Sequence, residues 1–215
     1  MPELCRICNT RRARRHCPGI GGDICSICCG DQREVNISCP LDCEYLREAR
    51  LHEKSVPIDP KSLPNQDVRL TEQFLQDHEE LVYFCSFTIA DAALRTPAAV
   101  DVDLQNALDA LIRTHRTLDS GLVYETRPGD RVAASIQELF ERSLAEFQKA
   151  RGSEQGLAPY RDAELIGALV FLQRSALTYT NGRPKGRAYI DFLRVRLRIE
   201  NAPGTGSVAG SLLVS

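Results

Sequence analysis

The sequence predicts a mainly α-helical protein in which a small cysteine-rich module precedes an all-helical bundle domain. Eight of the nine cysteines fall between Cys5 and Cys43, prolines cluster between residues 57 and 64, and apolar residues beyond Val68 recur at intervals of three and four. A composition that is 43% hydrophobic and 26% charged is typical of a globular chain. We expect a module over residues 1–53, a linker over 54–67, a helical domain over 68–199 and a flexible tail over 200–215.

The cysteine-rich module reads CRICNTRRARRHCPGIGGDICSICCGDQREVNISCPLDC. Zinc binds four thiolates tetrahedrally at about 2.3 Å, and a C-x2-C pair presents two sulfurs to one ion with little loop-closure cost. Eight thiolates therefore suit two zinc ions, each in a site closed by four ligands. The predicted ligands are Cys5, Cys8, Cys17, Cys25, Cys28, Cys29, Cys39 and Cys43.

The spacing leaves open which sulfurs share an ion. The neighbours Cys28 and Cys29 point in different directions, so they most easily serve different metals. A cross-braced arrangement would follow, with one zinc on Cys5, Cys8, Cys25 and Cys28 and the other on Cys17, Cys29, Cys39 and Cys43. His16 is a reserve ligand, because imidazole replaces thiolate at such sites.

The start of the chain, MPELCRIC, lacks a basic region followed by an apolar run, and we expect neither a signal peptide nor a membrane span. We therefore expect a cytoplasmic protein, whose reducing surroundings favour metal ligands over disulfides. The triplet Asn36-Ile37-Ser38 matches a glycosylation acceptor and leaves a secreted, disulfide-bonded protein as an alternative. Four cysteines also suit an iron–sulfur cluster, so a thiol or iron–sulfur redox sensor is a second alternative.

Two basic stretches are candidates for contact with a partner or a nucleic acid, although the net charge of −2 argues against general polyanion binding. Arginines beside zinc thiolates can hydrogen-bond to sulfur and offset its charge. The same arginines could instead contact phosphates. The residues are Arg11, Arg12, Arg14 and Arg15 in the module and Arg183, Lys185 and Arg187 in the helical domain.

The paired cysteines, with CP before a glycine turn and then ICSICC, resemble the cross-braced zinc fingers of the B-box, MYND and HIT-type group. The stretch from Cys28 to Leu46 also resembles the cysteine-rich start of some uncharacterised bacterial proteins, with the pattern CCG-x-x-REV-x-I-x-CP-x-DC-x-YL. The first resemblance covers about the first fifth of the chain and lacks closing histidines after Cys39. It implies protein or nucleic-acid contact without catalysis, and the second implies no activity.

The segment EYLREARLHE has helical spacing, and we expect it to pack Tyr45 and Leu46 onto the module. The prolines of KSVPIDPKSLPNQD then predict a stiff linker that forms the domain boundary.

The bundle is predicted from four apolar stripes. The first lies in a stretch whose pattern allows one break, ends before Thr96-Pro97 and includes Cys85, which we expect to be a buried hydrophobe. The second reaches as far as Leu122. We expect Asp101 or Asp103, then Asp130, then Asp162 to cap the second, third and fourth helices. A last segment, AYIDFLRVRLRI, favours a helix, although residues 193–199 also alternate like a strand.

Catalytic templates are missing: there is no HExxH, no GxSxG and no P-loop lysine. Zinc sites closed by four cysteines leave no open coordination position. His78 and His115 fall within helical stretches and are not expected to act as bases. We expect a non-enzymatic zinc-binding adaptor or regulator that acts through protein–protein contacts. A nucleic-acid-binding regulator is the alternative, an enzyme working in the helical domain stays open, and neither the partner nor the oligomeric state follows from the sequence.

Overall fold

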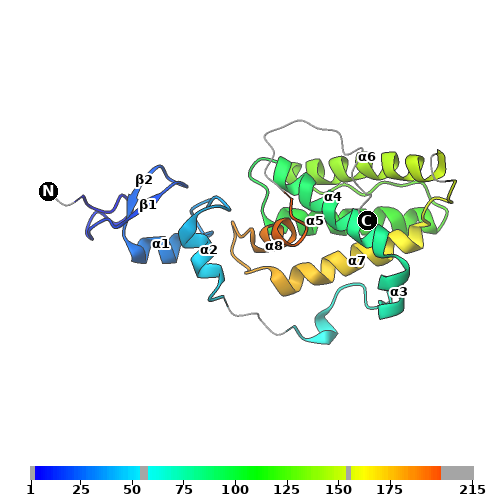
Figure 1. The fold of residues 1–215 in the computed structure, drawn as a ribbon, viewed down its shortest axis with the longest axis horizontal. Helices are drawn as coiled ribbons and strands as arrows, with labels where there is room; N and C mark the ends of the chain where they lie inside the picture. Colours follow the sequence, from blue (N-terminus) through cyan, green and yellow to red (C-terminus); the bar gives the residue numbers. More distant parts are fainter. Residues whose placement is uncertain (1–2, 54–57, 154–155, 200–215) are drawn as a thin grey trace, which may run out of the picture.

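The computed structural model describes residues 3–53, 58–153 and 156–199. Within these ranges the chain is mainly helical, as predicted, with eight α-helices and two short strands (Figure 1). The predicted tail, 200–215, and residues 54–57 of the predicted linker lie outside the described residues. The N-terminal part contains β1 (Arg15–Cys17), β2 (Gly22–Ile24), α1 (Ser26–Gln32) and α2 (Glu44–Arg50).

The larger part of the chain forms a helical bundle in which α5 packs against both α6 and α7, while α4 packs against α6, α7 and α8 (Figure 1). Its core is fully buried around Phe140 and Tyr189, and Cys85 lies within it as a buried hydrophobe. The elements are a 3-10 turn, η1 (Pro60–Ser62), and α3 (Glu72–Asp77), α4 (Glu79–Arg95), α5 (Asp101–Asp119), α6 (Arg131–Ser153), α7 (Asp162–Tyr179) and α8 (Ala188–Arg196).

The buried residues fall into two separate hydrophobic clusters, one in the bundle and one in the cysteine-rich part. The second cluster consists of four cysteines together with Ile24 and Ile37. So few apolar side chains cannot offset the conformational entropy of ordering this part of the chain. The cysteine-rich part therefore needs a further source of stability, such as a metal.

A two-stranded hairpin within the cysteine-rich part was not predicted. β1 and β2 pair antiparallel, with His16 opposite Asp23, and the chain reverses between them with Gly21 at a φ of +61°. Strands of three residues, Arg-His-Cys and Gly-Asp-Ile, are too short to show an alternation of apolar side chains. Their pairing can be inferred only after the flanking cysteine pairs, Cys5 with Cys8 and Cys25 with Cys28, are known to come together.

Asp103, one of the two residues predicted to cap the second helix, does so, whereas two other details of the predicted helices are wrong. The carboxylate of Asp103 accepts a hydrogen bond from Val100 N at the start of α5, whereas Asp101 accepts from Tyr189 N and Ile190 N and so caps α8. α5 ends at Asp119, which leaves Leu122 exposed. Asp162 is the first residue of α7 and pairs with a histidine instead of capping its own helix.

Other predictions are confirmed. Asp130 caps α6 by accepting from Val132 N and Ala133 N, and the first helical stretch breaks at His78 and ends at Arg95, just before Thr96-Pro97. The last segment is a helix as far as Arg196. None of the helices in the described ranges combines the length and the hydrophobicity needed to span a bilayer.

The end of the predicted linker lies against the bundle. The guanidinium of Arg174 in α7 donates hydrogen bonds to the backbone oxygens of Pro64, Asn65 and Val68. The Asn65 side chain also donates to Gln173 at 2.7 Å. Residues 64–68 are therefore fixed to α7 by polar contacts.

Candidate metal centre

Four cysteine side chains converge at the start of the module. The sulfur atoms of Cys5, Cys8, Cys25 and Cys28 all lie within 4.8 Å of one another, so this set could hold one metal ion. A tetrahedral zinc centre with Zn–S bonds of about 2.3 Å places its sulfurs about 3.8 Å apart, which this set can reach with small side-chain movements. We call it the Cys5 set.

Local backbone geometry brings the Cys5 set together. Cys5 and Cys8 lie on a tight turn in which Asn9 N donates to Cys5 O at 2.8 Å and Asn9 adopts a left-handed φ of +52°. Cys25 is the N-cap of α1, and Cys28 lies one turn further, so that Cys28 N donates to the Cys25 sulfur at 3.4 Å. A turn and a helix N-terminus thus present two sulfurs each.

Hydrogen bonds favour the thiolate form of two members of the Cys5 set, Cys8 and Cys5. Side-chain and backbone hydrogen bonds from Thr10 lower the pKa of Cys8 to about 5. Desolvation opposes ionisation of Cys5, yet hydrogen bonds from backbone amides, among them that of Cys8, outweigh it and lower the pKa of Cys5. A hydrogen bond with Cys25 raises the pKa of Arg11. The donors are arranged as they are around metal-bound sulfur.

Burial and the neighbouring thiols raise, instead of lower, the pKa of Cys28. Desolvation, followed by hydrogen bonding with Cys25 and Cys5, raises the pKa of Cys28 to about 12. Four thiolates cannot share such a small volume without a cation to balance their charge. A divalent ion supplies that charge, so the donor set fits a tetrathiolate metal centre.

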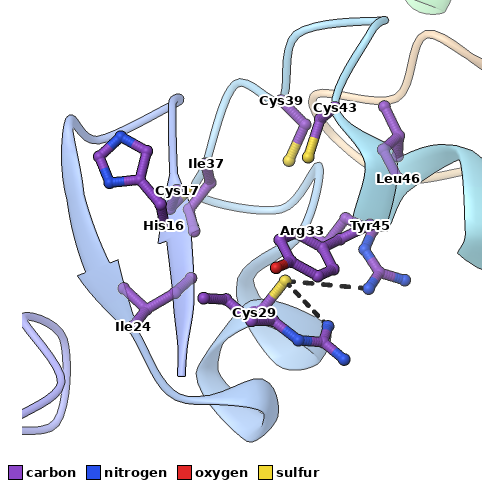
Figure 2. Close-up of a pocket in the computed structure, with 11 residues that line it drawn as sticks. His16, Cys17, Ile24, Cys29, Arg33, Ile37, Cys39, Cys43, Tyr45 and Leu46 are labelled. Atoms are coloured by element: carbon purple, nitrogen blue, oxygen red, sulfur yellow. Dashed lines mark hydrogen bonds between the residues drawn. The ribbon is translucent and has the colours of Figure 1, made fainter. Parts of the chain in front are cut away.

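The other four cysteines surround a second small cavity (Figure 2). Cys17 ends β1, Cys29 lies in α1, Cys39 lies in the loop before α2, and Cys43 is the N-cap of α2. The cavity has a volume of about 10 Å³, which is room for one water-sized atom or ion. Cys28 and Cys29 are successive residues of α1, and Cys28 belongs to the Cys5 set while Cys29 lines this cavity. We call these four residues the Cys17 set.

The Cys17 set is looser than the Cys5 set. Within the described ranges, no second group of cysteine, histidine or acidic side chains has all its ligand atoms within 4.8 Å. Burial raises the pKa of Cys39, as do the nearby charges of Glu34, Cys43 and Cys17, against a hydrogen bond from the Glu34 backbone amide. These thiols therefore lie close enough to influence one another without forming a compact tetrahedron.

Two arginines donate to the sulfur of Cys29 (Figure 2). Arg15 Nη1 lies 3.5 Å from this sulfur, and Arg33 Nη2 lies 3.9 Å from it. The Arg15 guanidinium also stacks on the ring of Tyr45 at 4.5 Å from its centroid, and Leu46 lines the cavity. The expected packing of α2 onto the module is thus confirmed.

His16 does not point at either set of sulfurs. Its side chain is 69% exposed, and His16 Nδ1 lies 3.0 Å from Asp23 Oδ1 across the hairpin (Figure 2). The hydrogen bond with His16 is the largest cause that lowers the pKa of Asp23. The structure therefore gives no support to His16 as a reserve ligand.

The basic residues predicted for partner contact divide into two groups. Arg15 donates to the Cys29 sulfur and Arg11 lies near the Cys25 sulfur, whereas the exposed Arg12 and Arg14 have no side-chain hydrogen bond or ion pair within the described ranges. The residues near the end of the chain contact the cysteine-rich part itself: Arg183 Nη1 donates to Arg33 O at 2.6 Å, Lys185 Nζ donates to Asn36 O at 2.7 Å, and Arg187 N donates to Glu34 Oε1 at 3.1 Å.

Glu34 is the important residue that sequence analysis missed. Its side chain is fully buried, and its carboxylate accepts hydrogen bonds from Arg50 Nη2 at 2.9 Å and from Asn181 Nδ2 at 2.7 Å. Arg50 also pairs with Asp191 of α8. No local pattern marks Glu34, because its partners come from residues 16 and about 150 positions away.

The bundle offers one histidine–carboxylate pair. His115 is buried, and its Nδ1 lies 2.7 Å from Oδ1 of Asp162, which links α5 to the start of α7. The His78 ring packs at a tilt against Phe74, with 4.5 Å between ring centroids. Both histidines therefore have structural partners, as expected.

The chain was compared with family models, with curated proteins and with solved structures, and none of the three comparisons found a match. The local resemblance to cross-braced zinc fingers therefore rests on the cysteine spacing alone.

Proposed function

We propose that this protein is a non-enzymatic, zinc-binding adaptor or regulator of the cytoplasm that acts through protein–protein contacts. The observation that carries the proposal is the Cys5 set, four thiols brought within 4.8 Å of one another and surrounded by hydrogen-bond donors. Four thiolates suit zinc and fill its coordination sphere, so the metal would stabilise the fold without performing chemistry.

The Cys17 set would hold a second zinc ion. Its four sulfurs border one small cavity, and Arg15 and Arg33 would offset the charge of a tetrathiolate site. Binding would require the sulfurs to close around the ion. Two such sites would replace the hydrophobic core that the cysteine-rich part lacks.

The nucleic-acid alternative loses support from the contacts of its basic residues. Arg11 and Arg15 neighbour sulfur, and the basic turn near residue 185 bonds to the cysteine-rich part. Arg12 and Arg14 are too few for strong phosphate binding. We expect at most weak, salt-sensitive binding of a single-stranded oligonucleotide, and tight binding lost on Arg12→Ala and Arg14→Ala would restore this alternative.

The adaptor function is tested by crosslinking the tagged full-length chain in cells that express it, in the wild type, Cys8→Ser and Cys85→Ala. Cys85→Ala removes a thiol from the bundle core and serves as the control. We expect a defined set of crosslinked proteins that survives Cys85→Ala and is lost with Cys8→Ser. The absence of any protein crosslinked to the wild type, or partners unaffected by Cys8→Ser, would contradict the proposal.

A further inference from the structure

Residues 33–36 make most of the polar contacts that dock the cysteine-rich part on the bundle, next to the Arg50–Asp191 ion pair and a hydrogen bond from Asn181 to Glu53. Glu34 is at the centre of this segment: its backbone oxygen accepts from Lys185 N at 2.8 Å, and its carboxylate accepts from Arg187 N at 3.1 Å. The side chains of Arg183 and Lys185 bond to backbone oxygens on either side of it. Residues 181–187 therefore form a niche for a carboxylate carried on a tight loop, which we call the Glu34 niche.

The docking segment has a conformation that a free chain would seldom adopt. Glu34 has a left-handed φ of +53°, and Gln32 O accepts hydrogen bonds from three successive amides, those of Val35, Asn36 and Ile37. A left-handed conformation is uncommon for a residue with a long side chain, so surrounding contacts must hold it. Some of those contacts come from the bundle and from Arg50, and others come from the cysteines at the two ends of the loop.

Both ends of the docking segment meet the Cys17 set. The Arg33 guanidinium donates to the Cys29 sulfur, and the Glu34 amide lies near the Cys39 sulfur. At Gly19, in the turn between β1 and β2, an added Cβ would lie 2.6 Å from Ile37 Cγ2, so the loop also packs closely on the hairpin. A metal that joined Cys29 to Cys39 would close the loop between them, which carries Glu34. Closure would lower the entropy cost of holding this loop in its docked conformation.

The Cys5 set has no such connection. Its side chains lie on the turn at residues 5–8 and at the start of α1, and within the described part of the chain none of them bonds to the bundle. The arrangement in Figure 1 agrees, because the bundle faces α2 and the loop that precedes it, while the start of the chain lies at the far end.

We propose that metal binding by the Cys17 set, and not by the Cys5 set, controls docking of the cysteine-rich part on the Glu34 niche. The inference rests on the second metal site of the proposed function. With the Cys17 set loaded, Glu34 fills the niche. When the metal leaves, the loop opens, and Arg183, Lys185 and Arg187 become available to an acidic segment of a partner.

The test is amide hydrogen exchange at Lys185 and Arg187 in the full chain, with the zinc content of each sample measured by native mass spectrometry. The variants are Cys43→Ser, in the Cys17 set, and Cys8→Ser, in the Cys5 set; each should carry one zinc instead of two. We expect exchange at both amides to accelerate at least tenfold in Cys43→Ser and to stay unchanged in Cys8→Ser. Equal effects of the two variants, or no effect of Cys43→Ser at this zinc count, would overturn the inference.

Two further measurements keep the test decisive if Cys43→Ser fails to fold. Glu34→Gln removes the charge that fills the niche, whereas Asp31→Asn makes the same change at an exposed position of α1. We expect faster exchange at Lys185 and Arg187 in Glu34→Gln alone, with two zinc ions retained. When zinc is added stepwise to the metal-free wild type, the Lys185 and Arg187 amides should become protected from exchange as the Cys17 set fills. If both amides are fully protected before any zinc binds, metal control is refuted.

A failure of the metal assignment looks different from a failure of the coupling. A wild type that binds a single zinc removes the second site and, with it, this inference, while the Cys5 centre stands. If the wild type binds two zinc ions but exchange at Lys185 and Arg187 does not depend on the Cys17 set, only the coupling is refuted.

Discussion

At the scale of single residues, contacts to sulfur separate two arginines of the basic run, Arg11 and Arg15, from Arg12 and Arg14. Arg15 and Arg33 both donate to Cys29, the α1 residue that belongs to the Cys17 set. The sequence alone presents Arg12 and Arg15 as equivalent members of one charged stretch. They differ because Arg15 begins β1, which carries it toward the sulfur, while Arg12 lies before the strand and is exposed.

Replacement of Arg33 by alanine should weaken metal binding at the Cys17 set. The change removes a hydrogen-bond donor from the sulfur of Cys29 but preserves the Arg33 backbone oxygen that contacts Arg183. We expect about a tenfold loss of zinc affinity, as for other groups that bond to metal ligands. Competition with a chromophoric chelator measures this loss. Arg12→Ala is the control, and equal affinities in the two variants would argue against a role for Arg33.

A second residue-scale prediction concerns pH. Burial raises the pKa of Asp101 to about 6, against hydrogen bonds from the amides of Tyr189 and Ile190. A carboxyl group with a raised pKa in the folded state stabilises the fold most below its ordinary pKa of about 4, and this contribution is lost as the pH rises through about 6. Asp101→Asn cannot titrate.

Urea unfolding of the wild type and Asp101→Asn across this pH range tests the assignment. We expect the free energy of unfolding of the wild type to fall relative to the variant by up to about 3 kcal/mol between pH 4 and pH 8. Effects of metal loss are common to the two proteins and cancel in the difference. Parallel pH profiles would mean that Asp101 keeps an ordinary pKa.

At the scale of the elements, the periodic helices were the predictable part. The apolar stripes of α4 to α7 exceed two turns each, so their period is visible and their ends follow from Pro97 and the capping role of Asp130. The hairpin and the role of Asp101 were not predictable. A three-residue strand is too short to show a period, and a carboxylate near a helix start can cap a helix elsewhere in the fold.

The contact between α3 and α7 depends on a glycine. A Cβ at Gly167 would lie 2.3 Å from Cζ of Phe74, so the ring packs directly on the backbone of α7. Gly167→Ala should lower the free energy of unfolding by about 1–3 kcal/mol through overpacking. In a Phe74→Ala background the same substitution should instead stabilise by up to about 1 kcal/mol, because alanine favours helix over glycine. Denaturant unfolding of the four proteins decides the sign, and destabilisation in both backgrounds would exclude this contact as the cause.

At the scale of the whole molecule, two hydrophobic clusters are joined by polar contacts around Glu34. The C-x2-C spacing predicted the four-thiol group of the Cys5 set, because it brings two sulfurs together within each short segment. The docking contacts were not predictable, since Glu34 and Asn181 meet only after both parts have folded. The division into domains at the linker stays a prediction.

Metal removal should act unequally on the two clusters. We expect a strong chelator to unfold the residues before the linker, where little but the metals supports the fold, and to leave most of the helical circular dichroism, which comes from α3 to α8. Hydrogen exchange with and without chelator locates the change. Loss of the entire helical signal would show that the bundle cannot stand without the cysteine-rich part.

The most direct measurement of the central claim is native mass spectrometry of the full chain purified without oxygen. The account predicts two zinc ions on each chain, with all eight thiols of the Cys5 and Cys17 sets free of disulfides. Iron with sulfide would instead indicate a redox protein, and one metal with oxidised thiols, or no metal at all, would contradict the two-zinc structure proposed for this module.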